Sequence, residues 1–186
     1  MKRLLVIMLV LICLSGCDSD GSGMDRALKI REQMITGKGY RFTANITADY
    51  GDKIYTFVLD CSSEGKDTLH FKVISPDSIS GISGSISGKG GSLTFDDQVL
   101  MFEMLADGQI TPVSAPWLFI KSLNSGYIKG CTTTDDGLFL QIDDSYLEDA
   151  MQLDIRINDR DVPVFVEIIW KNKRIISMEV EDFTYL

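Results

Sequence analysis

The stretch GYRFTANITADYGDKIYTFVLDC, residues 39–61, determines the fold that this sequence predicts. Apolar and polar residues alternate over residues 40–50, so the apolar side chains lie on one face of a strand. A turn follows at Gly51-Asp52, and the same alternation returns over residues 55–61. The pattern predicts an antiparallel hairpin with one apolar face and one wet face.

The rest of the chain continues this alternation and adds two helices. Residues 24–36 carry apolar side chains at helical spacing, including Leu28 and Ile35. Residues 117–126 predict a short helix that begins after Pro116 and is apolar on most sides, which suits a helix buried in the fold or filling an opening. Further strands are predicted at residues 69–75, 82–86, 93–104 (as a hairpin), 127–133, 138–143, 151–157, 164–170 and 175–185.

Residues 78–92, SISGISGSISGKGGS, are dense in serine and glycine yet carry regularly spaced isoleucines. We interpret them as a bent strand of small residues and a glycine-rich turn, because Ile82, Gly84 and Ile86 share one face. A phosphate-binding loop is the alternative. The segment lacks the GK[ST] ending and the following helix that such a loop requires.

The chain begins with a short basic head and an apolar run. Lys2 and Arg3 precede an uninterrupted apolar segment at residues 4–14. A membrane-spanning helix needs about 20 apolar residues, whereas a shorter run after a basic head is typical of a signal peptide. We therefore expect residues 1–16 to be an export signal that is removed.

The residues at the expected cleavage point, Leu14-Ser15-Gly16-Cys17, are a leucine, two small residues and a cysteine. This pattern resembles the bacterial lipobox. The resemblance implies that Cys17 receives a diacylglycerol with long acyl chains such as palmitate and becomes the first residue of a protein anchored on the extracytoplasmic face of the cell membrane. Two chains hold firmly, because each buried CH₂ contributes about 0.8 kcal/mol. The alternative is a secreted protein with a cysteine near its cleavage site.

Residues 17–23 are then the lipidated cysteine and a small, polar, flexible tether. Residues 24–186 have the length of a single domain with a full core. The whole chain has a net charge of −9, which argues against nucleic acid as a partner and against electrostatic attachment to anionic lipid. The acyl chains on Cys17 would therefore provide the membrane attachment.

Cys61 and Cys131 are the cysteines that remain once Cys13 leaves with the signal and Cys17 is lipidated. An oxidising compartment favours disulfides, but the sequence does not decide between a bridge and two separate thiols. No metal site is expected, because two distant cysteines and a single histidine, His70, lack ligand spacing. No cofactor is expected either.

The order of these elements resembles the LolA-like family of lipoprotein-carrier and envelope-lipoprotein domains over nearly the whole mature chain. The resemblance implies a mainly β (α+β) fold, an incomplete antiparallel β-barrel of about nine or ten strands with an N-terminal helix and a short central helix at its mouth. It rests on the front helix and on the segments GYRFTANITADY (39–50), SPDSISGI (75–82), LTFDDQVLMF (93–102), APWLFIKSL (115–123), LDIRINDRDVPVFVEIIW (153–170) and ISMEVEDFTYL (176–186).

The resemblance also implies an apolar cavity for acyl chains within the half-open barrel. The alternative is that the same side chains pack against one another in a filled core. The soluble carriers of the family have a basic residue before the proline of the third strand, where this chain has Ser75, so lipid transfer by their lid mechanism is not implied. The residues expected to line the cavity are Phe42, Ile46, Phe57, Leu59, Phe71, Phe102, Trp117 and Phe119.

Two functions remain open at this stage. The first is a membrane-anchored envelope lipoprotein that binds a lipid or another hydrophobic ligand. The second is a structural or sensory envelope lipoprotein whose packed barrel acts through contacts with another protein. An enzyme is not expected, because His70 lies in a strand facing away from Phe71 and no nucleophile-elbow motif occurs. The carboxylate pairs fall at turns, where solvated charge is the usual role.

Overall fold

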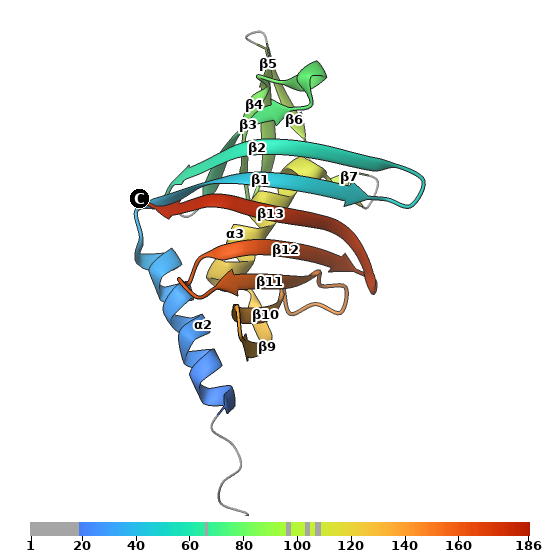
Figure 1. The fold of residues 1–186 in the computed structure, drawn as a ribbon. Helices are drawn as coiled ribbons and strands as arrows, with labels where there is room; N and C mark the ends of the chain where they lie inside the picture. The colour runs from blue at the N-terminus through green and yellow to red at the C-terminus, as the bar shows by residue number, and fades with distance from the viewer. Residues whose placement is uncertain (1–18, 66, 96–97, 103–104, 107–108) are drawn as a thin grey trace, which may run out of the picture.

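The computed structural model describes residues 19–186 apart from 66, 96–97, 103–104 and 107–108. Eleven antiparallel strands of this part form one open sheet with β6 and β9 at its edges (Figure 1). The predicted fold class, an incomplete antiparallel barrel, is confirmed, although the sheet has more strands than expected. In spatial order the strands are β6 (Gln98–Phe102), β5 (Gly90–Phe95), β4 (Ser83–Ser87), β3 (Thr68–Ser75), β2 (Ile54–Glu64), β1 (Gly39–Asp49), β13 (Lys173–Tyr185), β12 (Pro163–Trp170), β11 (Gln152–Asn158), β10 (Gly137–Asp143) and β9 (Tyr127–Thr134).

Strand β1 joins the early and late parts of the chain in the middle of the sheet. It pairs with β2 on one side and with the final strand, β13, on the other. Phe42, Ala44 and Ile46 are buried on the inner face, while Arg41 and Asp49 are exposed. Because both edges of β1 are paired, its alternation also fixes which faces of β2 and β13 are buried.

The helix α3 (Ala115–Ser125) fills the concave side of the sheet, behind the strands in Figure 1. It contacts β3 and β10, which lie on opposite sides of β1 in the strand order, so the sheet curls around it. Phe119 is fully buried and meets the ring of Phe42 edge-on, with ring centroids 5.9 Å apart. A short 3₁₀ helix, η2 (Pro112–Ser114), leads into α3, and Pro116 in its first turn suits a helix start.

The helix α2 (Ser19–Thr36) packs against β9, β10 and α3. Its buried stripe consists of Ala27, Ile30 and Met34, at a spacing that lines up on one helical face. Leu28, which the sequence pattern places on the apolar face, is 49% exposed because this stripe, not the neighbouring one, faces the sheet. Neither helix in the described part of the chain is long and apolar enough to cross a membrane.

The segment predicted to be a flexible tether, residues 17–23, is helical from Ser19 onward. A contact in this part of the helix holds it to the sheet. The Arg26 guanidinium binds the Asp161 carboxylate and donates to the Asn158 carbonyl at 2.7 Å, which ties α2 to the β11–β12 turn. The predicted signal segment 1–16 and Cys17 lie outside the described residues.

The serine- and glycine-rich segment forms the 3₁₀ turn η1 (Asp77–Ile79), strand β4 and the turn into β5. It is a bent strand and turn, as the sequence predicts. Gly84 is required by a close approach, because a Cβ there would lie 2.2 Å from the Ser92 carbonyl oxygen and 2.7 Å from the ring of Phe71. After β6, the short strands β7 (Leu105–Ala106) and β8 (Gln109–Ile110) pair with each other in a ladder that the sequence did not predict.

Cys61 and Cys131, for which the sequence left a bridge and two separate thiols open, are not joined by a disulfide in the structure. Cys61 lies in β2 and Cys131 in β9, with five strands between them in the sheet order. At about 4.8 Å per strand they are far beyond the span of a disulfide measured along the sheet. Burial, with a smaller effect of the Asp60 carboxylate, raises the pKa of the Cys61 thiol far above its ordinary range, so this thiol is unreactive at neutral pH.

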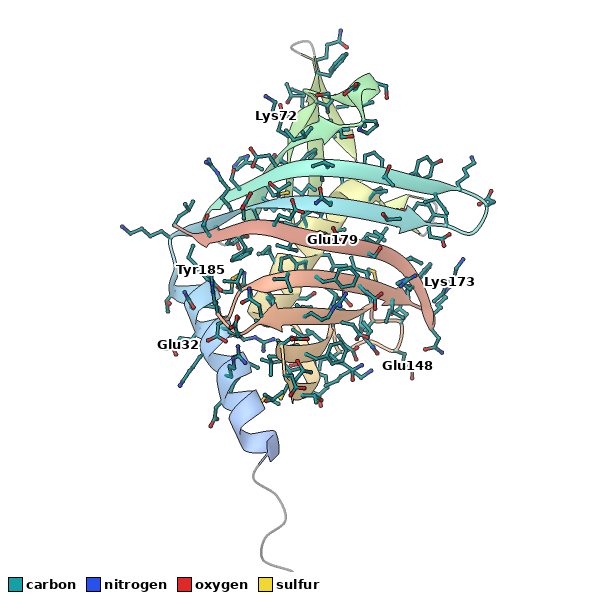
Figure 2. The ribbon with its side chains drawn as sticks, viewed as in Figure 1. Glu32, Lys72, Glu148, Lys173, Glu179 and Tyr185 are labelled. Atoms are coloured by element: carbon teal, nitrogen blue, oxygen red, sulfur yellow. The ribbon has the colours of Figure 1, made fainter. Side chains whose placement is uncertain are left out.

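The outer face of the sheet is solvated and mostly polar, with a few exposed apolar side chains such as Ile54 and Ile74. Lys72 of β3 and Glu179 of β13 project from it toward solvent (Figure 2). On β12 and β13, Glu167 accepts a hydrogen bond of 2.7 Å from the Arg174 guanidinium. The apolar and polar faces therefore separate as the alternation predicts.

Candidate functional site

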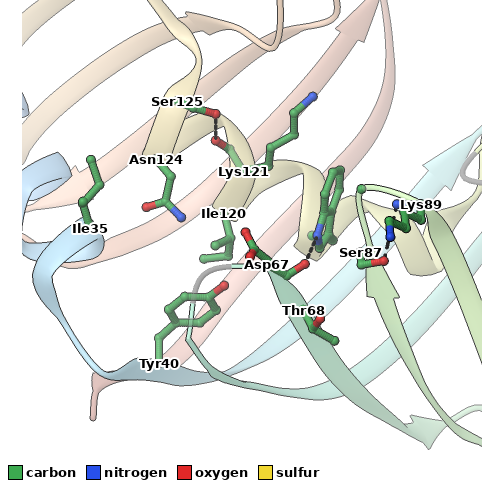
Figure 3. A pocket seen from close by; sticks show the side chains of 12 residues that line it. Ile35, Tyr40, Asp67, Thr68, Ser87, Lys89, Ile120, Lys121, Asn124 and Ser125 are labelled. Atoms are coloured by element: carbon green, nitrogen blue, oxygen red, sulfur yellow. Dashed lines mark hydrogen bonds between the residues drawn. The ribbon is translucent and has the colours of Figure 1, made fainter.

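A pocket of about 660 Å³ lies beside α3, on the flank of the half-open barrel where β1 begins (Figure 3). Four parts of the chain meet there: the end of α2, the start of β1, the β2–β3 turn and the β4–β5 turn. Its volume falls within the roughly 300–1,000 Å³ of pockets that hold small molecules. The lining residues are Ile35, Tyr40, Asp67, Thr68, Ser87, Gly88, Lys89, Trp117, Ile120, Lys121, Asn124 and Ser125.

One face of α3 forms the main wall of the pocket. Trp117, Ile120, Lys121 and Asn124 lie at positions i, i+3, i+4 and i+7, which one helical face presents together. The opposite face of the same helix packs into the core through residues such as Phe119. The helix that fills the barrel therefore also faces an open space.

Trp117 is held in place by its surroundings. Its indole Nε1 donates to the Asp67 carbonyl oxygen at 3.4 Å. The Lys121 ammonium stands 5.6 Å from the centre of the indole ring, a cation–π arrangement. These contacts present a fixed aromatic surface to the pocket.

Three polar side chains, Lys89, Lys121 and Asn124, lie beside the apolar wall. Lys89 and Lys121 carry positive charge, and Lys121 Nζ also lies 4.0 Å from Asp144 Oδ2. Asn124 points into the pocket in Figure 3, and its side-chain oxygen is buried without a hydrogen-bond partner in the described part of the chain. A ligand that donates a hydrogen bond to this buried acceptor would be bound more tightly, because the acceptor has no partner otherwise.

Tyr40 closes the inner end of the pocket. It is 3% exposed and stacks on Phe183, with ring centroids 6.3 Å apart and planes 14° from parallel. Burial raises the pKa of Tyr40 above its ordinary value. The phenol therefore stays neutral well above physiological pH.

The residues that the sequence assigned to a cavity are distributed differently in the structure. Five of them, Phe42, Ile46, Leu59, Phe71 and Phe119, are at most 3% exposed and pack in the core. These side chains fill the concave face and leave little of their surface to a ligand.

The other three predicted residues lie in three different places. Trp117 is the member of the set that lines the large pocket. Phe57 and Ile46 border a depression of about 350 Å³ whose remaining lining is largely polar. Phe102 lies in β6, and its side chain is outside the described residues.

Most of the lining residues were not predicted from the sequence, among them Ile35, Tyr40, Ile120 and Asn124. A signal for two of them was present, because Ile120 and Asn124 share a helical face with Trp117. The turn residues Asp67 and Lys89 gave no such signal, since only the folded sheet brings these two turns together.

No protein-family model matches this sequence, and no curated protein matches it. Solved structures do share its fold. A conserved protein from Thermus thermophilus is 11% identical, with a TM-score of 0.50 over 88% of this chain and 87% of that one. The chain shares the fold of that protein.

Two further structures are similar over most of this chain, at lower TM-scores. A LolA superfamily protein from Nitrosomonas europaea is 11% identical, with a TM-score of 0.45 over 90% of this chain and 94% of that one. A domain from Vibrio parahaemolyticus named for outer membrane lipoprotein sorting is 10% identical, with a TM-score of 0.47 over 89% and 92%. At these identities the similarity concerns the fold.

Proposed function

We propose that this protein is an envelope lipoprotein that binds an acyl chain, or a similar apolar ligand, in the pocket beside α3. The observation that carries the proposal is a pocket of about 660 Å³ walled by Ile35, Trp117 and Ile120. Apolar surface that a ligand covers contributes about 25 cal/mol per Å². An extended hydrocarbon lying along one face of α3 matches this wall.

The proposed membrane anchor fits the same role. In the proposal, Cys17 carries the diacylglycerol and residues 1–16 are removed, as the lipobox-like residues predict. The helix α2 begins at Ser19, directly after the anchor. Its other end supplies Ile35 to the pocket, so this helix links the bilayer to the proposed binding site.

The chemistry of the lining favours binding over catalysis. The described side chains around the pocket include serines, lysines and Asp67 but no histidine or cysteine. The Ser87 and Ser125 hydroxyls donate to the backbone carbonyls of Gly90 and Lys121 and not to a base, so both are weak nucleophiles. We therefore propose a binding protein and not an enzyme.

The two tryptophans provide a direct test. Trp117 lines the pocket, whereas Trp170 lies at a separate pocket with Tyr50, Lys171 and Lys173. In a Trp170→Phe variant, titration with palmitate should shift the emission of Trp117 to shorter wavelength, because the acyl chain displaces water from the indole. In the matched Trp117→Phe variant, the emission of Trp170 should not change.

A second measurement separates binding from a change in fold. Trp117→Ala should weaken the binding of the apolar dye N-phenylnaphthylamine about tenfold, or about 1.4 kcal/mol. Trp170→Ala is the control and should leave the dye affinity unchanged. Equal affinities in the two variants, or a palmitate response at Trp170 alone, would contradict the assignment of this pocket.

A second candidate function is supported by the packed interior. Phe42, Leu59 and Phe119 are fully buried against one another, as expected for a structural or sensory domain that acts through its surface. Native mass spectrometry distinguishes the two candidates. A retained acyl-chain mass supports lipid binding, whereas a clean apo mass together with no dye binding supports the packed alternative.

A further inference from the structure

The depression of about 350 Å³ lies on the outer face of the sheet, away from α3. Asn45 and Thr47 line it and alternate along β1 with buried side chains, so they leave the sheet on its outer face. Glu179 of β13, which also lines it, projects from the same face in Figure 2. We call this site the outer depression. Its volume falls within the roughly 300–1,000 Å³ of pockets that hold small molecules.

The strand register makes the lining of the outer depression one continuous patch. Asn45 lies opposite Val58 of β2 on one side and opposite Glu179 of β13 on the other. Glu179 in turn lies opposite Phe165 of β12. The next outward position on the three middle strands carries a hydroxyl group in each case, in Thr56, Thr47 and Ser177. Because β1, β2 and β13 are each paired on both sides, these side chains stand on a rigid support.

The polar groups of this patch have hydrogen-bonding capacity that the fold leaves unused. The polar side chains that line the outer depression are Asn45, Thr47, Thr56, Ser75, Ser177 and Glu179. None of these side chains forms a hydrogen bond or an ion pair with another residue of the described part of the chain. An ionised carboxylate only accepts hydrogen bonds, so Glu179 requires a donor from outside the fold.

This chemistry fits a carbohydrate better than an acyl chain or an anion. Hydroxyl and amide side chains both donate and accept, as the hydroxyl groups of a sugar ring do. An acyl chain would bury the polar lining without replacing its hydrogen bonds to water. A phosphate or carboxylate would meet the charge of Glu179, since the described lining includes no lysine or arginine.

Apolar surface flanks the carboxylate and narrows the class of sugar. Phe165 is the neighbour of Glu179 across the strands, and the Arg156 guanidinium holds its ring from 4.0 Å. Val58 supplies a second apolar side chain on the other side of Asn45. An acetamido group carries an N–H donor and a methyl group next to each other. One such substituent therefore meets both a carboxylate and the apolar side chain beside it.

We propose that the outer depression binds a glycan built from N-acetylated sugars. The acetamido N–H donates to the Glu179 carboxylate, and the methyl group packs against Phe165. The ring hydroxyls bond to Asn45 and Thr47. The pocket beside α3 lies on the other side of the sheet, so the proposal does not depend on lipid binding.

The test uses the full-length chain in lipid nanodiscs and isothermal titration calorimetry with two soluble tetrasaccharides. Chitotetraose, which carries an acetamido group on every ring, should bind saturably. Cellotetraose has the same linkage with hydroxyl groups in place of the acetamido groups, and it should bind at least about tenfold more weakly. No binding of chitotetraose, or equal affinities for the two sugars, would overturn the proposal.

Substitutions on the protein complete the test. Asn45→Ala and Glu179→Ala should each weaken chitotetraose at least about tenfold, and circular dichroism checks that both variants fold. Glu181→Ala is the matched control, because Glu181 is the next outward residue of β13, is exposed and does not line the depression. Trp117→Ala, in the pocket beside α3, should also leave the affinity unchanged.

Three results would contradict this assignment. Unchanged affinity in both Asn45→Ala and Glu179→Ala would remove the outer depression as the site. An equal loss in Glu181→Ala would show that acidic charge on this face acts without a defined site. A loss in Trp117→Ala alone would place the sugar in the pocket beside α3.

Discussion

Two rows of side chains cross the inner face of the sheet and differ in how they are covered. One row runs through Leu140, Ile155, Val166, Met178 and Ile46, and each member is at most 1% exposed. The other begins at the buried Phe42 and Cys61, passes Phe71, Gly84 and Leu93, and ends at the exposed Leu100. The row from β10 to β1 is thus covered throughout, whereas the row from β1 to β6 ends uncovered, and the β2–β3 and β4–β5 turns of the same half border the pocket beside α3.

The largest effect should come from the first row. Ile155→Ala removes a fully buried side chain that lies opposite Leu140 and Val166, so we expect the free energy of unfolding to fall by about 2–5 kcal/mol. Leu100→Ala, at the end of the second row, should change it by less than about 0.5 kcal/mol. Urea unfolding followed by circular dichroism measures both. Similar losses in the two variants would remove the distinction between the rows.

The contact that holds α2 to α3 should rank next. The Arg31 guanidinium donates to the Leu123 carbonyl at 2.7 Å and to the Gly126 carbonyl at 2.8 Å, at the C-terminal end of α3. Arg31→Ala should therefore lower the free energy of unfolding by about 2–3 kcal/mol, because carbonyl groups lose a charged donor. Arg31→Lys should recover only part of this, since an ammonium cannot reach both carbonyls as a planar fork does.

A smaller loss of stability should follow when a methyl group is added at Gly84, the glycine of the second row. In Gly84→Ala the new methyl group meets the Ser92 carbonyl oxygen and the Phe71 ring, and the backbone oxygen cannot simply rotate away. We expect a loss of about 1–2 kcal/mol in the free energy of unfolding. Gly88→Ala is the control, because a methyl group there lies 3.9 Å from Trp117, which is ordinary contact. A loss in the control as large as in Gly84→Ala would show that flexibility of the segment, and not the close approach, is what glycine supplies.

The two rows also explain what the sequence could and could not predict. Alternation over β1 and β2 identified the inner face correctly, because a strand with one covered face has a period of two whatever covers it. The hairpin over residues 93–104 was predicted from the same alternation. The structure confirms it, since Phe95 at the end of β5 pairs with Gln98 at the start of β6. Alternation does not say what lies over the apolar face. Phe42 and Leu59 therefore have the same pattern in a packed core as they would in an open cavity.

The pocket residues that the topology brings together could not be predicted from the sequence, for a different reason. Asp67 and Lys89 lie in turns, where composition indicates exposure but not neighbours. They enter the pocket because β3 and β4 are adjacent and α3 passes over both turns. Cys61 and Cys131 are residues that the topology keeps apart. The compartment and the even number of thiols allow a disulfide, but they do not reveal the five strands that lie between the two cysteines in the sheet.

The smallest effect should depend on pH and arises where the first and last strands meet. Tyr185 lies opposite Tyr40 in the register, and its hydroxyl is buried without a hydrogen-bond partner in the described part of the chain. Burial, with a smaller effect of the Asp161 charge, raises the pKa of Tyr185 from 10.0 to about 12. Between these values the unfolded chain loses the phenolic proton while the native chain keeps it. The native state then binds more protons, so the free energy of unfolding falls as the pH rises through this interval.

Urea unfolding at about pH 9 and about pH 11.5 should detect this loss, and Tyr185→Phe should reduce it because phenylalanine has no proton to lose. Part of the pH dependence should persist, since burial also raises the pKa of Tyr40. Tyr146→Phe, at a side chain that is 82% exposed, serves as the control and should leave the dependence intact. If Tyr185→Phe and Tyr146→Phe behave alike, the alkaline loss arises elsewhere and the junction of β1 with β13 is less tightly closed than the packed row beside it.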